Sequence, residues 1–315
     1  MLNDQKLQML IQRTVKKWID PAAEVVRIEA APIHTGTQAI ELMRHRVLLK
    51  KCGETSAVSL VTKYASRIEQ QVLIWLYAQK ANVPFCLSSG FDGSEVDGRS
   101  LICIQDVDYE TNYNNINISL LQENEMEALA HIHIANFDQK SQLSWLPEAG
   151  IFHVEKMICE RWRPQWKEAK KNAEFIEVFG GYIPAVEAAA GTILQDIPCV
   201  IHDERSQTLI HNDLNPGNVL VHNNTEVIFI DWEEAKYGSL FLDIPLRCRT
   251  LEQLKKYREL LAAKGIIFSD QYFNKMYTIA SRYLGLRYMS WNLGAWTIHD
   301  HARDDLKRYM GMVVE

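Results

Sequence analysis

The pattern of hydrophobic and polar residues divides the chain into a first part rich in strands and a second part rich in helices. In the first part, apolar residues between Leu7 and Trp18 recur at helical spacing with polar residues between them, which predicts an amphipathic N-terminal helix. Strands are predicted at Val25–Ile33, Ala39–Cys52, Ala57–Tyr64 and Ser100–Val107, and a helix at Ser66–Gln79. Antiparallel strands with one inserted helix indicate a small α+β unit.

From residue 117 onward the apolar spacing is mostly helical. Helices are predicted at Leu120–Phe137, Glu155–Phe179, Ile183–Leu194, Thr250–Lys264 and Asp270–Leu293. Ser119 and Gln122 fit a capping box before the first of these, and Pro164 is expected to break or kink the second. Only the stretches Gln207–Val221 and Glu226–Ile230 interrupt the helical pattern, with short β-rich runs around an irregular loop.

Composition and charge narrow the class of protein. The chain has 315 residues, of which 47% are hydrophobic and 23% charged, as in an ordinary globular protein of one or two domains. A net charge of −6 argues against nucleic acid as a partner. The six cysteines form no C-x-x-C pair and are widely spaced, so buried free thiols in a reducing cytosol are expected. Neither a secretory signal nor a long apolar run is present, which predicts a cytoplasmic protein with no membrane partner.

Polar residues gather at the one β-rich interruption of the helical part. A β-run delivers His211-Asn212-Asp213 to a loop, Pro216-Gly217 turns the chain, and a second run starts after Asn218. A third, apolar run ends at Asp231. We expect Asp213, Asn218 and Asp231 to point into one cavity, and their hard oxygen atoms suit Mg²⁺, which binds through one or two carboxylates plus substrate phosphates. Such a set fits phosphoryl transfer, which depends mainly on positioning and charge neutralisation.

The alternative is an ordinary surface turn, because Asp, Asn, Pro and Gly are common turn residues. Apolar runs flank the loop on both sides, however. A carboxylate at the end of a buried strand loses hydration free energy, so its presence there suggests a function. We therefore favour the functional interpretation.

The motif H-N-D-L-N-P-G-N-V-L, followed by I-D-W-E, resembles the signature of the aminoglycoside phosphotransferase and choline kinase family. The match is specific over residues 208–245, where it includes Gly238 and the Phe241–Ile244 stretch, and it extends more weakly over residues 25–300. The resemblance implies a two-lobed, protein-kinase-like α+β fold. Residues 1–105 would form a nucleotide-binding lobe with a small antiparallel sheet, and residues 106–315 a mainly helical lobe with the catalytic and acceptor sites.

The resemblance also implies roles for individual residues. Asp213 would be the catalytic aspartate that orients the acceptor hydroxyl and accepts its proton, while Asn218 and Asp231 would hold Mg²⁺. His211 would support the loop by hydrogen bonding, and Asp243 would brace the loop from below.

In the predicted N-terminal lobe, Lys63 matches the strand lysine that contacts the phosphates of ATP, with Glu69 as its helix partner. Burying an unpaired lysine at the end of an apolar strand costs folding free energy, so Lys63 is expected to have a partner. The alternative is that Lys63 lies on an edge strand and only aids solubility. The backbone around Gln105 and Val107 would bind adenine. The protein-kinase Gly-rich loop is absent, so Gly36, in Thr35-Gly36-Thr37, would contribute to phosphate binding instead.

The acceptor is expected to be a hydroxyl group of a small molecule, but its identity stays open. Acidic side chains would suit a polycationic aminoglycoside, and aromatic ones a quaternary ammonium group, whereas Arg287 could seat an anion. The candidate wall residues are Glu233, Glu234, Trp162, Trp166, Tyr288, Trp291, Trp296, Asp300, Asp304 and Asp305. Tryptophans at helical spacing are more often core residues.

Three functions remain in competition. The leading hypothesis is an ATP- and Mg²⁺-dependent small-molecule kinase, active as a monomer or homodimer. The second is a nucleotide-binding pseudokinase or regulatory module without turnover. The third is a metal-dependent phosphohydrolase that uses His202, Asp203, His211, Asp213 and His222 as ligands, although a second set of carboxylates is missing.

Overall fold

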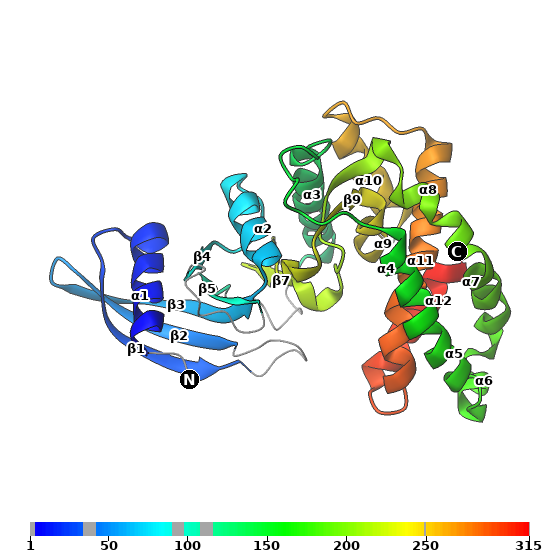
Figure 1. Ribbon diagram of the computed structural model, residues 1–315, viewed down its shortest axis with the longest axis horizontal. Helices are drawn as coiled ribbons and strands as arrows, with labels where there is room; N and C mark the ends of the chain where they lie inside the picture. The colour runs from blue at the N-terminus through cyan, green and yellow to red at the C-terminus, as the bar shows by residue number, and fades with distance from the viewer. Residues whose placement is uncertain (1–3, 34–41, 90–97, 108–115, 249, 315) are drawn as a thin grey trace. The chain divides into compact units, whose positions relative to one another are not determined.

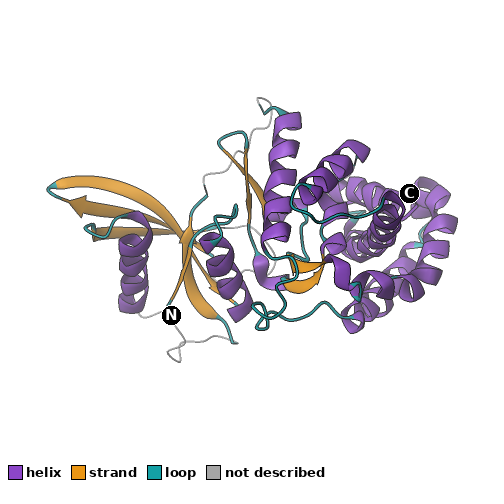
Figure 2. Ribbon diagram, turned by 90° about the horizontal axis from the view of Figure 1, so that it is seen from above, coloured by secondary structure: helices purple, strands orange, loops and turns teal. Residues whose placement is uncertain are grey.

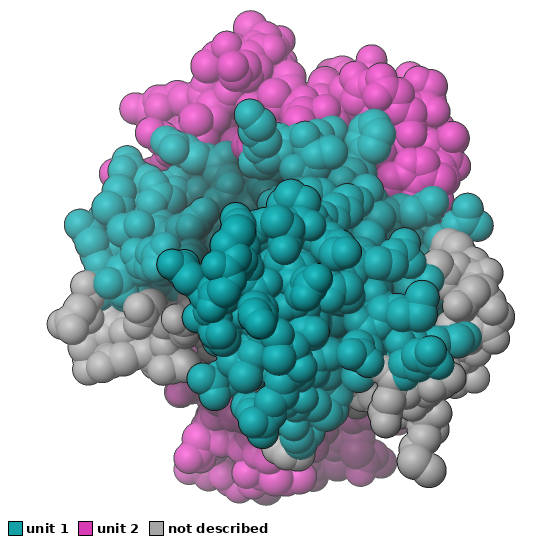
Figure 3. Space-filling model, turned by 90° about the vertical axis from the view of Figure 1, so that its left-hand side faces the viewer, with its two compact units in different colours: residues 1–128, 215–235 teal, residues 129–214, 236–315 magenta. Residues whose placement is uncertain are grey.

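The computed structural model describes residues 4–33, 42–89, 98–107, 116–248 and 250–314. The chain divides into two compact units, one formed by Met1–Ala128 with Asn215–Ala235 and the other by Leu129–Leu214 with Lys236–Glu315; Figure 3 colours them separately. These units do not coincide with the expected segments 1–105 and 106–315, because the segment 215–235 clusters with the N-terminal part of the chain.

The first unit is built on a five-stranded antiparallel sheet with the order β1-β2-β3-β5-β4 (Figures 1 and 2). The strands are β1 (Glu24–Pro32), β2 (Met43–Lys51), β3 (Glu54–Ala65), β4 (Cys86–Ser88) and β5 (Ser100–Gln105). Residues alternate between the two faces of a strand, and in β2 His45, Val47 and Leu49 are the buried set. The predicted strands are therefore present, with boundaries shifted by a few residues.

The N-terminal helix α1 (Asp4–Thr14) continues into a π-helical turn, Val15–Ile19. Leu10, Ile11 and Val15 are buried together with Val47 and Leu60 of the sheet in one hydrophobic core. The predicted amphipathic helix thus packs on the sheet through the apolar stripe that the sequence pattern identified. Trp18 extends this core, with its ring 5.9 Å from that of Phe85.

Helix α2 (Arg67–Ala78) begins where the Ser66 side chain accepts a hydrogen bond from the backbone N–H of Glu69 at 3.2 Å. Val72, Leu73 and Leu76 lie on its buried face, and so does Glu69. A buried carboxylate on an otherwise apolar helix face requires a partner, and β3 supplies one.

The segment that joins the first unit from later in the chain is a hairpin of β7 (Val219–His222) and β8 (Glu226–Phe229). Its strands pair antiparallel, with Val219 opposite Phe229. The Phe229 N–H donates to the carbonyl of Asn82 at 2.8 Å, and the Asn124 amide donates to the carbonyl of Thr225 at 2.6 Å. These bonds anchor the hairpin to the loop after α2 and to α3.

The second unit is mainly helical. Its helices are α3 (Ile118–Ala135, which begins in the first unit), α4 (Ile151–Lys156), α5 (Arg163–Ala169), α6 (Ala173–Phe179), α7 (Ile183–Asp196), α8 (Pro198–Ile201), α9 (Ile244–Arg247), α10 (Leu251–Ala262), α11 (Asp270–Ala295) and α12 (Asp300–Val314). A two-stranded sheet of β6 (Gln207–Ile210) and β9 (Lys236–Ser239) completes the unit. The sequence pattern predicted neither β9 nor α12.

Two helix details differ from the sequence prediction. Helix α3 begins one residue before Ser119, and Asn117 accepts the hydrogen bond from the Leu120 N–H at 3.1 Å, so the predicted capping box at Ser119 is wrong. Pro164 does not break its helix, because it lies in the first turn of α5, directly after a π-helical segment, Met157–Trp162; a kink at this position stays a prediction. The break comes later, where the Asn172 side chain caps α6.

All six cysteines are free thiols, as expected, but the expectation that they are buried is wrong for three of them. Cys86, Cys103 and Cys248 are buried, and Cys52, Cys159 and Cys199 are exposed. Among the helices that the structure describes, none combines the length and apolar character needed to cross a membrane.

Candidate active site

In the second unit, strand β6 leads into the loop His211-Asn212-Asp213, which is held by the buried carboxylate of Asp243. Asp243 Oδ2 accepts the N–H of His211 at 2.7 Å, and Oδ1 accepts the N–H of Asn212 at 2.8 Å. Asn212 has a φ of +63°, the left-handed region that glycine and asparagine tolerate best. Two charge-assisted bonds to one carboxylate fix the backbone of this strained turn.

Behind Asp243 lies a second buried pair. His133 Nε2 is 3.3 Å from Asp243 Oδ2, and His133 Nδ1 is 2.5 Å from the hydroxyl of Tyr257. Burial raises the pKa of Tyr257 well above its usual value, so the phenol keeps its proton. The bracing of the loop therefore extends from Asp243 through α3 to α10.

Helix α11 supplies two consecutive side chains to the same loop. The Tyr288 hydroxyl donates to Asp213 Oδ1 at 2.6 Å, and the Arg287 guanidinium donates to the side-chain oxygen of Asn212 at 3.0 Å. Burial raises the pKa of Tyr288 well above its usual value, Arg287 opposes this, and the nearby Asp213 raises it further. The Tyr288 phenol is therefore a stable hydrogen-bond donor to Asp213.

In the first unit, Lys63 forms ion pairs with two carboxylates. Its Nζ lies 2.7 Å from Glu69 Oε1 and 3.1 Å from Asp231 Oδ1. The Lys63 side chain is 14% exposed and that of Glu69 2%, whereas that of Asp231 is 46% exposed. The expected Lys63–Glu69 pair is thus present, and the edge-strand alternative for Lys63 does not fit a buried, doubly paired ammonium.

The electrostatics of this trio follow from burial and charge. Burial alone lowers the pKa of Lys63, but the charges of Glu69 and Asp231 raise it above its usual value. Burial raises the pKa of Glu69, Lys63 lowers it, and Asp231 adds to the rise, so the net direction is upward. Lys63 is consequently a fixed cation next to an accessible carboxylate, Asp231.

Asn218 and Asp231 meet at one end of the β7–β8 hairpin. The N–H of Ile230, directly before Asp231, donates to the carbonyl of Asn218 at 3.0 Å. Asn218 ends a short 3-10 turn that the Asn215 side chain caps, and Asp231 has a φ of +63°. An amide oxygen and a half-exposed carboxylate are a donor set that fits Mg²⁺, whose remaining ligands are usually water and substrate phosphates.

The expected convergence of Asp213 with Asn218 and Asp231 stays a prediction, because Asp213 belongs to the second unit and the other two residues to the first. His211 Nδ1 accepts the N–H of Asp213 at 3.3 Å, which is a loop-supporting contact. Gly36 lies outside the described residues.

Gln105 ends β5, and its N–H already donates to the carbonyl of Phe85 at 3.2 Å. An adenine contact from Gln105 would therefore use its carbonyl. The next residue, Asp106, accepts hydrogen bonds from Arg44 at 2.7 Å and Ser59 at 2.6 Å, which ties the segment before Val107 to the sheet.

The aromatic candidates for an acceptor wall fall into two groups. Trp162, Trp166 and Trp296 are buried, and the first two stack at 5.5 Å within an aromatic cluster that includes Phe175. These three are core residues, which confirms the more ordinary interpretation. Trp291 is 55% exposed and stacks on His299, at 6.4 Å.

Of the five acidic candidates, Glu234, Asp300 and Asp304 are exposed, whereas Glu233 and Asp305 are paired with arginines. Glu233, in the first unit, is paired with Arg99, a residue that sequence reasoning missed because nothing marks an isolated arginine at the start of a strand. Asp305 pairs with Arg308 at 3.0 Å. Each of these two carboxylates, one in either unit, is therefore already partly neutralised.

The hydrolase alternative finds no support among the described residues. No group of three or more His, Cys, Asp or Glu side chains is arranged there to hold a metal ion. Asp203, one of its proposed ligands, is engaged by Arg205 at 3.1 Å and by the Tyr272 hydroxyl.

Comparisons with known proteins agree with this arrangement. A model of the phosphotransferase enzyme family matches residues 61–250, more than half of the chain. The search of curated protein sequences found no match to this chain.

Among solved structures, the chain is similar to one described as an aminoglycoside phosphotransferase from Ralstonia eutropha JMP134, with 16% identity over 99% of this chain and 96% of that one and a TM-score of 0.62. It is similar to spectinomycin phosphotransferase in complex with ADP and spectinomycin (13% identity, 98% and 97% covered, TM-score 0.60). It is also similar to choline kinase from Cryptosporidium parvum Iowa II (14% identity, 98% and 95% covered, TM-score 0.58).

Identities this low establish the fold alone, and they confirm the predicted α+β, protein-kinase-like architecture. The family match adds the class of activity, the transfer of a phosphoryl group. The chain therefore belongs to the phosphotransferase enzyme family.

Proposed function

We propose that the protein is an ATP- and Mg²⁺-dependent kinase that transfers the γ-phosphoryl group to a hydroxyl of a small molecule. The observation that carries the proposal is the ion-pair trio of Lys63, Glu69 and Asp231. It places a fixed cation on a central strand beside an accessible carboxylate, the combination that binding a metal–triphosphate complex requires.

Different residues would bind the nucleotide and the acceptor. Lys63, oriented by Glu69, would bind the phosphates; Asn218 and Asp231 would hold Mg²⁺. When bound, Mg²⁺ neutralises the charge of the β- and γ-phosphates. The carbonyl of Gln105 and the backbone of Val107 would bind adenine.

Asp213 would orient the acceptor hydroxyl and accept its proton as the oxygen–phosphorus bond forms and ADP leaves. The loop geometry supports this role, because Asp243 fixes the backbone on one side and Tyr288 fixes the carboxylate on the other. A group that must be placed to within a fraction of an ångström benefits from two such constraints.

A test separates catalysis from binding. We expect Asp213→Ala to abolish ADP release with every acceptor, while the affinity for ATP·Mg²⁺, measured by calorimetry, stays within about twofold of the wild type, since Asp213 does not bind the nucleotide. The wild type is first assayed against a panel of hydroxylated amines, amino alcohols and hydroxy acids. Equal turnover in the variant would overturn the role of Asp213.

The metal ligand has its own test. Asp231→Ala should weaken ATP binding at least tenfold in the presence of Mg²⁺, but much less in EDTA, because it removes a ligand of the ion. Glu234→Ala, three residues along the chain, is the matched control and should leave the affinity unchanged. If Asp231→Ala bound ATP·Mg²⁺ as the wild type does, Asp231 would not be a metal ligand.

The non-enzymatic alternative predicts a different outcome. A nucleotide-binding module would be stabilised by ATP·Mg²⁺ in thermal unfolding, yet it would release no ADP with any acceptor of the panel. The Asp213 carboxylate, held by Tyr288 on a loop whose backbone Asp243 fixes, favours the enzyme, because a module without turnover has no use for such positioning.

A further inference from the structure

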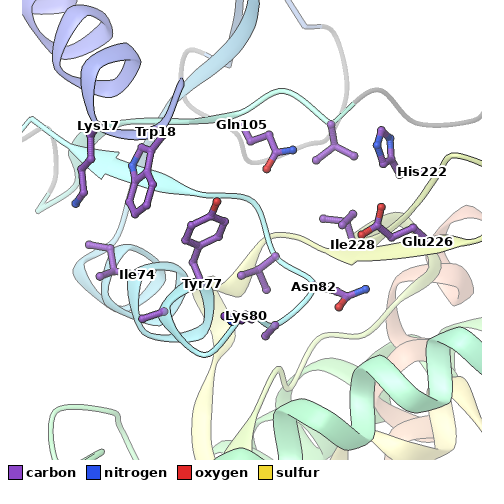
Figure 4. A pocket seen from close by; sticks show the side chains of 14 residues that line it. Lys17, Trp18, Ile74, Tyr77, Lys80, Asn82, Gln105, His222, Glu226 and Ile228 are labelled. Atoms are coloured by element: carbon purple, nitrogen blue, oxygen red, sulfur yellow. The ribbon is translucent and has the colours of Figure 1, made fainter. Parts of the chain in front are cut away.

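The first unit contains a cavity of about 630 Å³ behind the end of β5 (Figure 4). Its walls come from four places in the chain: the π-helical turn after α1, the end of α2 with the following loop, the segment after β5, and the β7–β8 hairpin. The volume lies within the range of small-molecule sites.

This cavity is separate from the ion-pair trio described above. None of Lys63, Glu69 and Asp231 lines it, and neither does Asn218. It shares only Gln105 and Val107 with the residues assigned to the nucleotide.

The lining is mainly apolar, and its uncharged polar groups include, besides the ring nitrogens of Trp18 and His222, the side chains of Tyr77, Asn82 and Gln105. Ile74, Val83 and Ile228 contribute apolar surface. The Tyr77 hydroxyl and the Gln105 carboxamide point into the space between them in Figure 4, and the Asn82 carboxamide lies on the opposite wall. The side chains of these three residues form no hydrogen bond to any residue that the structure describes.

The rings of Trp18 and Tyr77 contribute to one wall, with Phe85 packed behind them. The ring of Tyr77 meets that of Trp18 edge-on at 4.9 Å and that of Phe85 at 6.2 Å. Rigid aromatic walls favour planar, apolar ring systems, since these lose little conformational entropy on binding.

Charge lies only on the rim and is of both signs. Lys17 and Lys80 are exposed on one part of the rim, and Glu226 is exposed on another (Figure 4). The Lys17 ammonium makes a cation–π contact with the Trp18 ring, 4.6 Å from its centroid. A rim without a dominant sign favours an uncharged ligand.

We propose that this cavity binds a neutral, planar heteroaromatic molecule that carries a ring amide. A carboxamide presents a donor and an acceptor side by side, and therefore pairs with an adjacent N–H and C=O through two hydrogen bonds. Gln105 and Asn82 offer two such groups, and the Tyr77 hydroxyl can donate or accept a third bond. The aromatic wall accommodates the ring.

The test compares two ring systems of the same size on the full-length protein. Hypoxanthine carries a ring amide, and purine has the same rings without it. In ligand-detected NMR titrations, hypoxanthine should bind at least about fivefold more tightly than purine, and saturating ADP with Mg²⁺ should not displace it. Absence of hypoxanthine binding, equal affinity for purine, or displacement by ADP would each overturn the proposal.

Two variants locate the site. Ala78→Phe adds a ring to an exposed residue of the cavity wall, so it should block hypoxanthine without disturbing the core. Tyr77→Phe removes one hydroxyl and should weaken binding about fivefold, whereas Tyr182→Phe, in the second unit, should have no effect. Thermal unfolding checks that each variant is folded. Unchanged binding in both cavity variants would exclude this site.

Discussion

At the scale of single residues, consecutive side chains on α11 serve the loop that carries Asp213. Tyr288 donates to the Asp213 carboxylate and Arg287 to the Asn212 side chain. Neither contact was foreseeable in detail, because which turn of a 26-residue helix lies opposite a loop depends on packing. Tyr288 and Arg287 were candidates for the acceptor wall, whereas their observed contacts give Tyr288 a positioning role.

This role predicts a specific kinetic defect. Tyr288→Phe should lower kcat about tenfold or more and leave the KM for ATP unchanged, because a hydrogen bond to a charged group contributes about 1.5–3 kcal/mol. Initial-rate kinetics measure both constants. Tyr277→Phe is the control, since the hydroxyl of Tyr277, on the same helix, donates to the carbonyl of Cys248 instead. An unaltered kcat in Tyr288→Phe would contradict the positioning role.

His45 makes the stability of the first unit depend on pH. Its side chain is 1% exposed and shares a 2.7 Å hydrogen bond with Thr62, and burial lowers its pKa. In the unfolded chain histidine titrates near pH 6.5, so below this pH the unfolded state takes up a proton that the folded state does not. The stability attributed to neutral His45 is therefore complete above pH 6.5 and is lost as the pH falls towards the folded-state pKa.

The measurement is urea unfolding of the wild type and of His45→Gln at pH 7.5, 6.5 and 5.5. For each pH unit below 6.5, the unfolding free energy of the wild type should fall, relative to that of His45→Gln, by at most about 1.4 kcal/mol. A constant difference across this range would show that His45 does not take part in the pH dependence.

At the scale of elements, α11 and α12 pack so closely that one position has no room for a methyl group. A Cβ on Gly285 would lie 2.6 Å from the carbonyl oxygen of Tyr309 and 2.6 Å from Val313 Cγ2. This close contact explains why a glycine stands in the middle of α11: the packing of the two helices compensates for the low helix propensity of glycine.

Gly285→Ala should consequently lower the free energy of unfolding by about 1–3 kcal/mol, although alanine favours a helix. Gly294→Ala is the matched control on the same helix, because a Cβ there is 3.7 Å from its nearest neighbour. We expect this control to raise stability by about 0.5–1 kcal/mol. Chemical denaturation gives both values, and a neutral or stabilising Gly285→Ala would contradict the close packing.

The elements also show what the sequence could and could not predict. The strands β1, β2, β3 and β5 and most long helices follow from hydrophobic spacing, and the Lys63–Glu69 pair was implied by the family resemblance. Strand β9 was missed because Lys-Tyr-Gly-Ser is too short and too polar for a periodicity signal. The true cap of α3 was missed because Asn117 and Ser119 are both good capping residues, and only the backbone decides between them.

At the scale of the whole molecule, the cysteines divide into two classes. Burial raises the pKa of the Cys86 thiol, and it raises the pKa of Cys103 to about 12, so both stay protonated and unreactive. With Cys248 they form the buried set, while Cys52, Cys159 and Cys199 are exposed.

A thiol-reactive dye should therefore modify three cysteines rapidly in the native protein and all six in guanidinium chloride. Mass spectrometry of digested protein identifies the modified positions. Rapid modification of Cys86 or Cys103 under native conditions would indicate that the first unit opens more readily than its packing implies.

The order in which the chain visits its two units has a consequence for protein engineering. The polypeptide passes from one unit to the other after Ala128, after Leu214 and again after Ala235, so the hairpin that carries Asn218 and Asp231 is encoded inside the sequence of the helical unit. Neither unit can be excised as one uninterrupted fragment. Recombination between relatives that aims to change the acceptor must therefore use several crossover points, because a single junction would separate the β7–β8 hairpin from the loop after α2, to which Asn82 anchors it.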